Sequence, residues 1–254
     1  MPLIGPDEEP SLDADIAVVD GQAAPSDRVP LDRARIVAAG IDYVDANGLA
    51  GLTMRRLGAD LGVEAMSLYR YVSGRDELLA AIVDHVIDEV GLDPDIITAP
   101  EHGWQDFLQR LAHGFRRVAL AHPHVFPLVA SHPTEAPWIR PPVRSLQWVD
   151  LFLDGLITEG FSDEMAVATY RAFTSFLLGH LLLEASTMGA AVGPLDLTEQ
   201  PSGSGPGVEA YPHVHRLSEA LSENHSATEF EEALEQLLDR LAQVLGANGG
   251  RDSG

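Results

Sequence analysis

Apolar side chains recur every three to four residues along most of this chain, and no segment shows the strict alternation typical of a β-strand. The pattern predicts an all-α fold with helices at 31–46, 53–61, 65–71, 75–90, 104–121, 124–131, 140–160, 163–189, 212–223 and 228–246. Proline-containing breaks at 93–100 and 190–210 predict a linker and a long excursion between helices.

The stretch 49–75 predicts two short helices joined by a tight turn. Thr53 stands where a helix N-cap would, although Arg56 three residues later is not the Glu or Gln of a full capping box. Gly62 suits the left-handed conformation in which a chain leaves a helix. Two short helices that cross steeply form a helix-turn-helix. Its inward positions are Leu52, Leu57, Leu61, Val63, Leu68 and Val72.

The polar side of the second short helix is unusual for a solvated surface. An ordinary helical hairpin is the alternative interpretation, but its outer face normally carries Glu and Lys. Basic side chains interleaved with aromatic ones fit a polyanion better than water. The outer residues are Ala65, Met66, Ser67, Tyr69, Arg70 and Tyr71, with Arg55, Arg56 and Arg75 nearby.

At these residues the chain resembles a known family. LDRARIVAAGIDYVDANGLAGLTMRRLGADLGV and SLYRYVSGRDELL, within 31–84, resemble the DNA-binding domain of the tetracycline-repressor (TetR) family of bacterial regulators. GWQDFLQRLAHGFRRVALAHP and the later HPTE resemble the ligand-binding domain of the tetracycline repressors themselves. The resemblance implies a homodimer that binds a palindromic operator in double-stranded DNA. It also implies that Arg55 and the first residues of the third helix face base edges, while Thr53, Tyr69, Tyr71 and Arg75 contact phosphates.

The chemistry of the candidate DNA-binding residues agrees with this division. Arg55 can form two parallel hydrogen bonds with a guanine edge. Arg70 can read a base or hold a phosphate, and the sequence leaves both open. The other candidates are hydroxyls that can donate to phosphates, on Thr53, Ser67, Tyr69 and Tyr71, and apolar groups that can contact a thymine methyl, on Ala65 and Met66.

The formal net charge of -23 argues at first against a nucleic-acid partner. Its distribution changes that picture, because residues 1–27 carry seven acidic side chains and no basic one. Residues 28–75 carry seven arginines against five acidic side chains. The predicted helix-turn-helix domain, which we call the reader, is therefore locally basic, and we expect weak non-specific DNA binding.

Two late segments, 173–183 and 230–245, are apolar on most of their faces or carry a continuous apolar stripe. A monomer can bury both by itself; we favour a four-helix contact between two copies around a two-fold axis. The expected organisation is a disordered acidic extension (1–30), a helix-turn-helix domain (31–75), a connecting helix and linker (76–100), a ligand-binding and dimerisation domain (101–246) and a flexible tail (247–254).

Aromatic and apolar side chains of the second domain can line a cavity for a small-molecule effector, although plain core packing is the alternative for each of them. The candidates are Trp104, Phe107, Leu111, Phe115, Leu128, His132, Trp148, Phe152, Phe176 and His180. The histidines and the amide that hold tetracycline with magnesium in the tetracycline repressors have no counterparts at 125–131, Leu111 or 89–91. We therefore expect a less polar effector, with His132 or His180 as polar anchors.

Other chemistry finds little support in the sequence. The two H-x-H pairs, 122/124 and 213/215, adjoin prolines and lack carboxylates at ligand spacing, so we expect neither a metal nor a cofactor. Nucleophile, P-loop and dinucleotide motifs are missing, so we expect no enzyme. The chain has no cysteine, no leader pattern and no uninterrupted apolar run of about 18 residues, so we expect a cytoplasmic protein without a membrane partner.

Together these features predict a ligand-responsive transcription regulator, most simply a repressor that leaves its operator when an apolar or amphipathic effector binds. The alternative is a helical dimeric interaction protein that has lost DNA binding, and the net charge is its best support.

Overall fold

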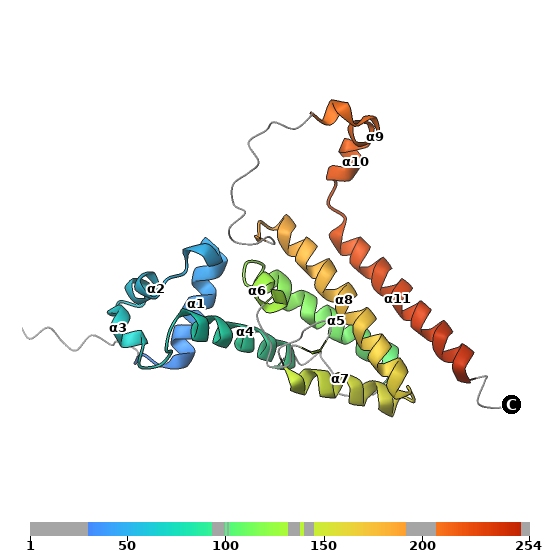
Figure 1. The fold of residues 1–254 in the computed structure, drawn as a ribbon, viewed down its shortest axis with the longest axis horizontal. Helices are drawn as coiled ribbons and strands as arrows, with labels where there is room; N and C mark the ends of the chain where they lie inside the picture. The colour runs from blue at the N-terminus through green and yellow to red at the C-terminus, as the bar shows by residue number, and fades with distance from the viewer. Residues whose placement is uncertain are drawn as a thin grey trace, which may run out of the picture. The chain divides into compact units, whose positions relative to one another are not determined.

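The computed structural model describes residues 30–92, 100, 102–131, 138–139, 145–191 and 207–249. The chain divides into Met1–Leu31 and Asp32–Gly254, and the architecture below belongs to the second unit. Every regular element in the described ranges is helical, which confirms the predicted all-α class (Figure 1). The predictions for residues 1–29, 192–206 and 250–254 lie outside the described residues.

Four helices form the N-terminal part of this unit: α1 (Arg33–Asn47), α2 (Met54–Asp60), α3 (Ala65–Leu68) and α4 (Arg75–Leu92), with a 3-10 turn, η1 (Leu49–Gly51), between the first two. α1 packs on α4 and α2 packs on α3. On the inner face of α1, Ile36, Val37, Gly40, Ile41 and Val44 are buried, while Tyr43 is only half-buried. Tyr43 stays near the surface because its hydroxyl donates to the carbonyl of Gly51, 3.0 Å away.

α4 continues from this part into the helical core. Its apolar side chains are buried, and the helix contacts α1, α5 and α6. These side chains are Leu78, Leu79, Ile82, Val83, Val86 and Ile87. At the start of the helix, the side chain of Glu77 accepts a 2.7 Å hydrogen bond from the amide of Ser73. This bond is the main reason that the pKa of Glu77 is lowered. α4 is thus one continuous element shared by both halves of the unit.

The core is built from α5 (Trp104–Ala121), α6 (Phe126–Ser131), α7 (Leu146–Thr158), α8 (Asp163–Thr187) and α11 (Ser226–Gly249). α8 lies at its centre and contacts the other four helices; Figure 1 shows α11 running beside it. By length and apolar composition alone, α8 would be long enough to cross a bilayer. A core helix of a globular protein has a similar composition, and the buried side chains of Ala166, Tyr170, Phe173, Leu177 and Leu181 belong to this core.

Three of the predicted helices have different boundaries in the structure. α3 stops at Leu68 rather than at 71, because the amides of Tyr71 and Val72 both bond to the Leu68 carbonyl and tighten the chain into a turn. The predicted helix 212–223 is two short helices, α9 (Pro212–Arg216) and α10 (Ser218–Ser222), separated at Leu217 with φ -104° and ψ 8°. α7 begins at Leu146, with Ser145 as its N-cap.

Candidate nucleic-acid interface and effector pocket

The turn between α2 and α3 has the geometry that a helix-turn-helix requires. Gly62 has φ +69°, and its amide bonds to the carbonyl of Ala59. The amide of Val63 bonds to the carbonyl of Gly58 at 2.8 Å, which completes a Schellman motif. A Cβ atom on Gly58 would lie 3.0 Å from the Val63 carbonyl oxygen and 3.1 Å from the Ala65 nitrogen, so any larger residue would push the two helices slightly apart.

The start of α2 is fixed by side chains that bond to the preceding turn. Thr53 is the N-cap, as predicted, and its hydroxyl accepts from the amide of Arg56 at 3.2 Å. Arg56 in turn donates to the carbonyl of Gly51 at 2.9 Å. Arg75, from the start of α4, donates through Nε to Leu52 and through Nη2 to Leu49, at 3.1 and 3.2 Å. The orientation of α2 is therefore tied to both α4 and η1.

The predicted DNA-facing side chains form one exposed surface around α3. Leu68 and Val72 form the buried side of this segment and are 0% and 1% exposed. Met66 is 72% exposed, and Tyr69 and Tyr71 are 45% and 39% exposed. These are large side chains that a protein normally buries, and here they face solvent. The other members of this surface are Thr53, Arg55 and Arg70, which are exposed, and Ala65 and Ser67, which are half-buried.

Arg75, the last of the predicted DNA-binding residues, also bonds within the protein. Its guanidinium donates to two backbone carbonyls of the turn before α2, and the side chain is partly exposed. These bonds fix the position of Arg75, and its contact with a DNA phosphate stays a prediction.

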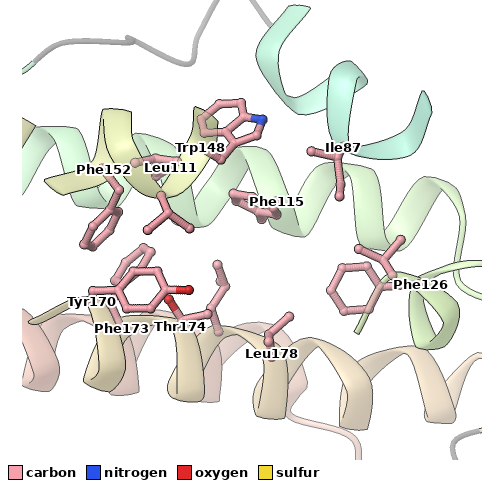
Figure 2. A pocket seen from close by; sticks show the side chains of 13 residues that line it. Ile87, Leu111, Phe115, Phe126, Trp148, Phe152, Tyr170, Phe173, Thr174 and Leu178 are labelled. Carbon is pink, nitrogen blue, oxygen red and sulfur yellow. The ribbon is translucent and has the colours of Figure 1, made fainter. Parts of the chain in front are cut away.

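A small apolar cavity lies among α4, α5, α6, α7 and α8 (Figure 2). Its volume is about 60 Å³. The residues that line it include no charged side chain, and the polar groups on their side chains are the hydroxyls of Tyr170 and Thr174 and the indole N–H of Trp148. Ile87 brings α4, the helix shared with the reader, into the wall. The full lining is Ile87, Leu111, Phe115, Phe126, Val129, Trp148, Val149, Phe152, Tyr170, Phe173, Thr174, Leu177 and Leu178.

Burial of Tyr170 controls its chemistry. Loss of hydration raises the pKa of this phenol to about 12, and a hydrogen bond with Thr174 only partly opposes the rise. The phenol is thus neutral at physiological pH and can donate a hydrogen bond. The ring packs edge-on against Phe152, with 5.7 Å between the ring centres.

Four of the predicted ligand-binding residues line the cavity: Leu111, Phe115, Trp148 and Phe152. Five others do not. Trp104 packs edge-on against Phe161, while Phe107 and Leu128 are buried core residues. Phe176 stacks on Phe230 and His180 bonds to the carbonyl of Ser226, so both face α11. His132 lies outside the described residues.

Most of the α8 residues that line the cavity were not among the predicted ligand-binding residues. Tyr170, Phe173, Thr174 and Leu177 follow an i, i+3, i+4, i+7 pattern, which marks one face of a helix. The pair of hydroxyls within this otherwise apolar face was the available signal. Aromatic content instead favoured Phe176 and His180, which lie on the neighbouring face.

Residues 98–245 match the model of the tetracyclin repressor-like C-terminal domain. The repressor DrrR1 of Streptomyces coeruleorubidus is 36% identical over 113 residues, which is 44% of this chain and 40% of that protein, so the chain spans less than half of that relative's length. A possible TetR family transcriptional regulator from Streptomyces coelicolor A3(2) superposes with a TM-score of 0.65 at 30% identity, over 84% of this chain and 100% of the other.

ActR of Streptomyces coelicolor, solved in complex with actinorhodin, superposes with a TM-score of 0.61 at 25% identity, over 84% of this chain and 96% of ActR. The family match covers more than half of the sequence, and the helix-turn-helix precedes it in the chain. The chain therefore belongs to the TetR family of transcriptional regulators.

Proposed function

We propose that this protein is a cytoplasmic, homodimeric repressor that leaves a palindromic operator when a small, largely apolar effector binds. The exposed surface around α3 carries this proposal. Met66 of α3, the phenols of Tyr69 and Tyr71 and the guanidinium of Arg70 in the turn that follows, and Arg55 of α2 face solvent. Leu68 and Val72 in the same segment are buried. Aromatic and apolar side chains gain little free energy from contact with water, whereas this set of groups can contact the bases and phosphates of a duplex groove.

Each member of the surface has a chemical role in the proposed complex. Arg55 contacts a base edge, and Arg70 contacts a base or a phosphate. The hydroxyls of Thr53, Ser67, Tyr69 and Tyr71 bind phosphates, and Ala65 and Met66 make apolar contacts in the groove.

A homodimer is supported by the solvent-facing side of α8. Small side chains recur along it at helical spacing, at Ala168, Ala172, Ser175 and Gly179, and the exposed Leu183 follows one turn later. Small residues let two helices approach closely, and a second copy would cover this side. Two readers on a two-fold axis would bind half-sites about one helical turn, or ~34–36 Å, apart.

The effector pocket of the proposal is the cavity around Tyr170. Its walls exclude charged groups, so the buried part of the effector is apolar and aromatic. ActR, whose structure contains actinorhodin, supports the idea of an organic effector in this fold. An effector acts on DNA binding only if it favours one arrangement of the two readers over the other. α4 is the connecting element, because it contributes Ile87 to the cavity and Arg75 to the turn before α2.

The test is a gel-shift titration against the DNA upstream of the protein's own gene, at two salt concentrations. We expect binding that needs the palindrome and weakens steeply as salt rises, because phosphate contacts release counterions. A scrambled duplex of the same composition is the control. Equal binding to both duplexes, or none to either at low salt, would refute the proposal and favour the alternative of a helical interaction protein, which the charge of -23 supports.

A further inference from the structure

Two hollows meet at one tyrosine. The first is the small cavity of about 60 Å³, and the second is a wider groove of about 670 Å³ along α7 and α8. Tyr170 and Val149 belong to the lining of both. The groove is otherwise lined by Trp138, Ile139, Leu146, Gln147, Asp150, Leu153, Val167 and Arg171.

The sizes of the two hollows limit how they can be used. Pockets that enclose a drug-sized molecule have volumes of roughly 300–1,000 Å³. The small cavity has a volume far below this range, and the groove is large enough but open to solvent. A ligand of that size can be both accommodated and enclosed only if the two hollows join, which requires the wall between them to move.

Tyr170 is the part of that wall that can move. The side chain of Val149 is short and branched, so its position follows that of α7. The phenol ring of Tyr170 turns about two side-chain torsions, and the bond to Thr174 one turn along α8 helps to hold it in place. Rotation of this ring would join the cavity to the groove without unfolding either helix.

The linings of the two hollows differ in chemistry. The small cavity is largely aromatic and uncharged, whereas the groove adds Gln147, Asp150 and Arg171 beside the 77% exposed ring of Trp138. Arg171 forms no ion pair with another described residue. An arginine offers only hydrogen-bond donors, so its complement on a ligand is an oxygen-rich group.

We propose that the Tyr170 side chain separates the two halves of one effector site, and that the effector is an elongated aromatic molecule with an apolar end and a hydrogen-bond-accepting end. The apolar end lies in the cavity on one side of Tyr170, and the accepting end lies in the groove beside Arg171. This inference rests on the proposed function, because it specifies the effector of the same pocket.

The three tryptophans of the chain allow a direct test. Trp148 lines the cavity, Trp138 lines the groove, and Trp104 lines neither. We would label the full-length protein with 5-fluorotryptophan, assign the three ¹⁹F signals with single Trp→Phe variants, and titrate 8-anilinonaphthalene-1-sulfonate, an aromatic probe with one anionic end. One joined site predicts that the Trp148 and Trp138 signals shift with the same midpoint while Trp104 stays unchanged. Different midpoints, or a static Trp148 signal, would overturn the proposal.

Two substitutions test the role of the hydroxyl pair. Tyr170→Phe and Thr174→Val both remove the hydrogen bond and keep a side chain of similar size. We expect each to raise the association rate of the probe severalfold, because the ring turns more easily. Tyr211→Phe, on an exposed tyrosine far along the chain, is the matched control and leaves the rate unchanged. Unaltered rates in both variants, with melting temperatures showing that they are folded, would contradict the role of Tyr170.

The orientation of the ligand is tested with a second probe. Arg171→Gln is expected to weaken binding of the sulfonate probe severalfold and to leave its uncharged analogue N-phenyl-1-naphthylamine unaffected. Arg240→Gln, on the exposed side of α11, should alter neither. Equal effects of Arg171→Gln on the two probes would remove Arg171 from the site.

All of these measurements are made without DNA. Failure of the upstream DNA to bind would therefore refute the proposed function while leaving the joined site standing, and a negative probe result would leave the DNA-binding proposal intact.

Discussion

The Nδ1 atom of His122 lies 2.7 Å from Oδ2 of Asp45, a residue 77 positions earlier in the chain. The Nε2 atom of the same ring lies 3.2 Å from Oε2 of Glu89. One imidazole at the end of α5 thus joins α1 and α4, and so links the reader to the core. The Nε2 atom of His85, an exposed residue, also lies 3.5 Å from Oε1 of Glu89. The helix that follows His122 in the chain, α6, carries no charged side chain.

The His122 contacts predict a pH-dependent contribution to stability. The hydrogen bond with Asp45, together with attraction to Asp45 and Glu89, raises the pKa of His122 against the opposing effect of burial. A raised pKa in the folded state means that the stabilisation is fully present below the pKa of the unfolded chain, about 6.5. It is lost as pH rises through the higher pKa of the folded protein.

We therefore expect His122→Gln to lower the free energy of unfolding by on the order of 1–2 kcal/mol at pH 5.5, and by clearly less at pH 8.5. Urea unfolding of both proteins across this range measures the difference. His215→Gln, on the exposed α9, is the control and should cost little at any pH. A cost for His122→Gln that does not vary with pH would show that the imidazole is not charged in the folded state.

The ion pair between Arg116 and Glu184 predicts a large effect from a small change. Two bonds join the groups, Nε–Oε2 at 3.0 Å and Nη2–Oε1 at 2.6 Å, and Glu184 is 7% exposed. Glu184→Gln removes the bonded counter-charge of the guanidinium and leaves only the weaker attraction to Glu231, so we expect a loss of about 3 kcal/mol in the free energy of unfolding. Asp106→Asn, in the more exposed pair with Arg110, should cost at most about 1 kcal/mol. Similar costs for the two variants would contradict this ranking.

The contact between Gly155 and Phe107 predicts that one added methyl group is not tolerated. A Cβ atom at Gly155 would lie 2.9 Å from Cε1 of Phe107, and that ring is fully buried and cannot withdraw. Gly155→Ala should destabilise the protein by roughly 1–3 kcal/mol through overpacking, as measured by denaturant unfolding. Adding Phe107→Leu creates space at the same position, so the double variant should lose less than the sum of the two single variants. Strict additivity would show that the clash is relieved in another way.

Gly179 distinguishes a lone chain from a dimer. A Cβ atom at this helical position would meet nothing within 4 Å in the single chain. In a monomer, Gly179→Ala should therefore stabilise the helix by about 0.5–1 kcal/mol. In the proposed dimer the added methyl group meets the partner helix, so we expect weaker self-association in sedimentation equilibrium. Unchanged association would exclude Gly179 from the interface.

Arg55 is the most specific element of the proposed DNA contact. Arg55→Ala should cost about 1–3 kcal/mol in operator affinity and relax the preference at one base position in each half-site. Binding to a panel of operators with single-base changes measures both effects. Arg240→Ala, distant in sequence and exposed on α11, controls for the loss of one positive charge. An affinity loss that is the same for every operator would make Arg55 a phosphate contact instead.

The helices and the turn of the reader were predictable because their causes are local. Thr53 caps α2 through a bond three residues away, and Gly48 and Gly62 end helices with positive φ. The alternation of apolar and polar positions separated Leu68 and Val72, which are buried, from Tyr69 and Tyr71, which are exposed. Information of this kind lies within a few residues of the chain and needs no tertiary contact to be read.

The pocket and the long-range ion pairs were decided by tertiary structure alone. Phe176 and Thr174 lie two positions apart on α8, yet one packs on α11 and the other lines the cavity, because α7 and α11 cover different sides of the same helix. An apolar residue has the same signature in sequence whether it fills a core or borders a hollow. Partners such as Asp45 and His122 meet only after three helices have packed, since their charges attract over a few ångströms and not along the sequence.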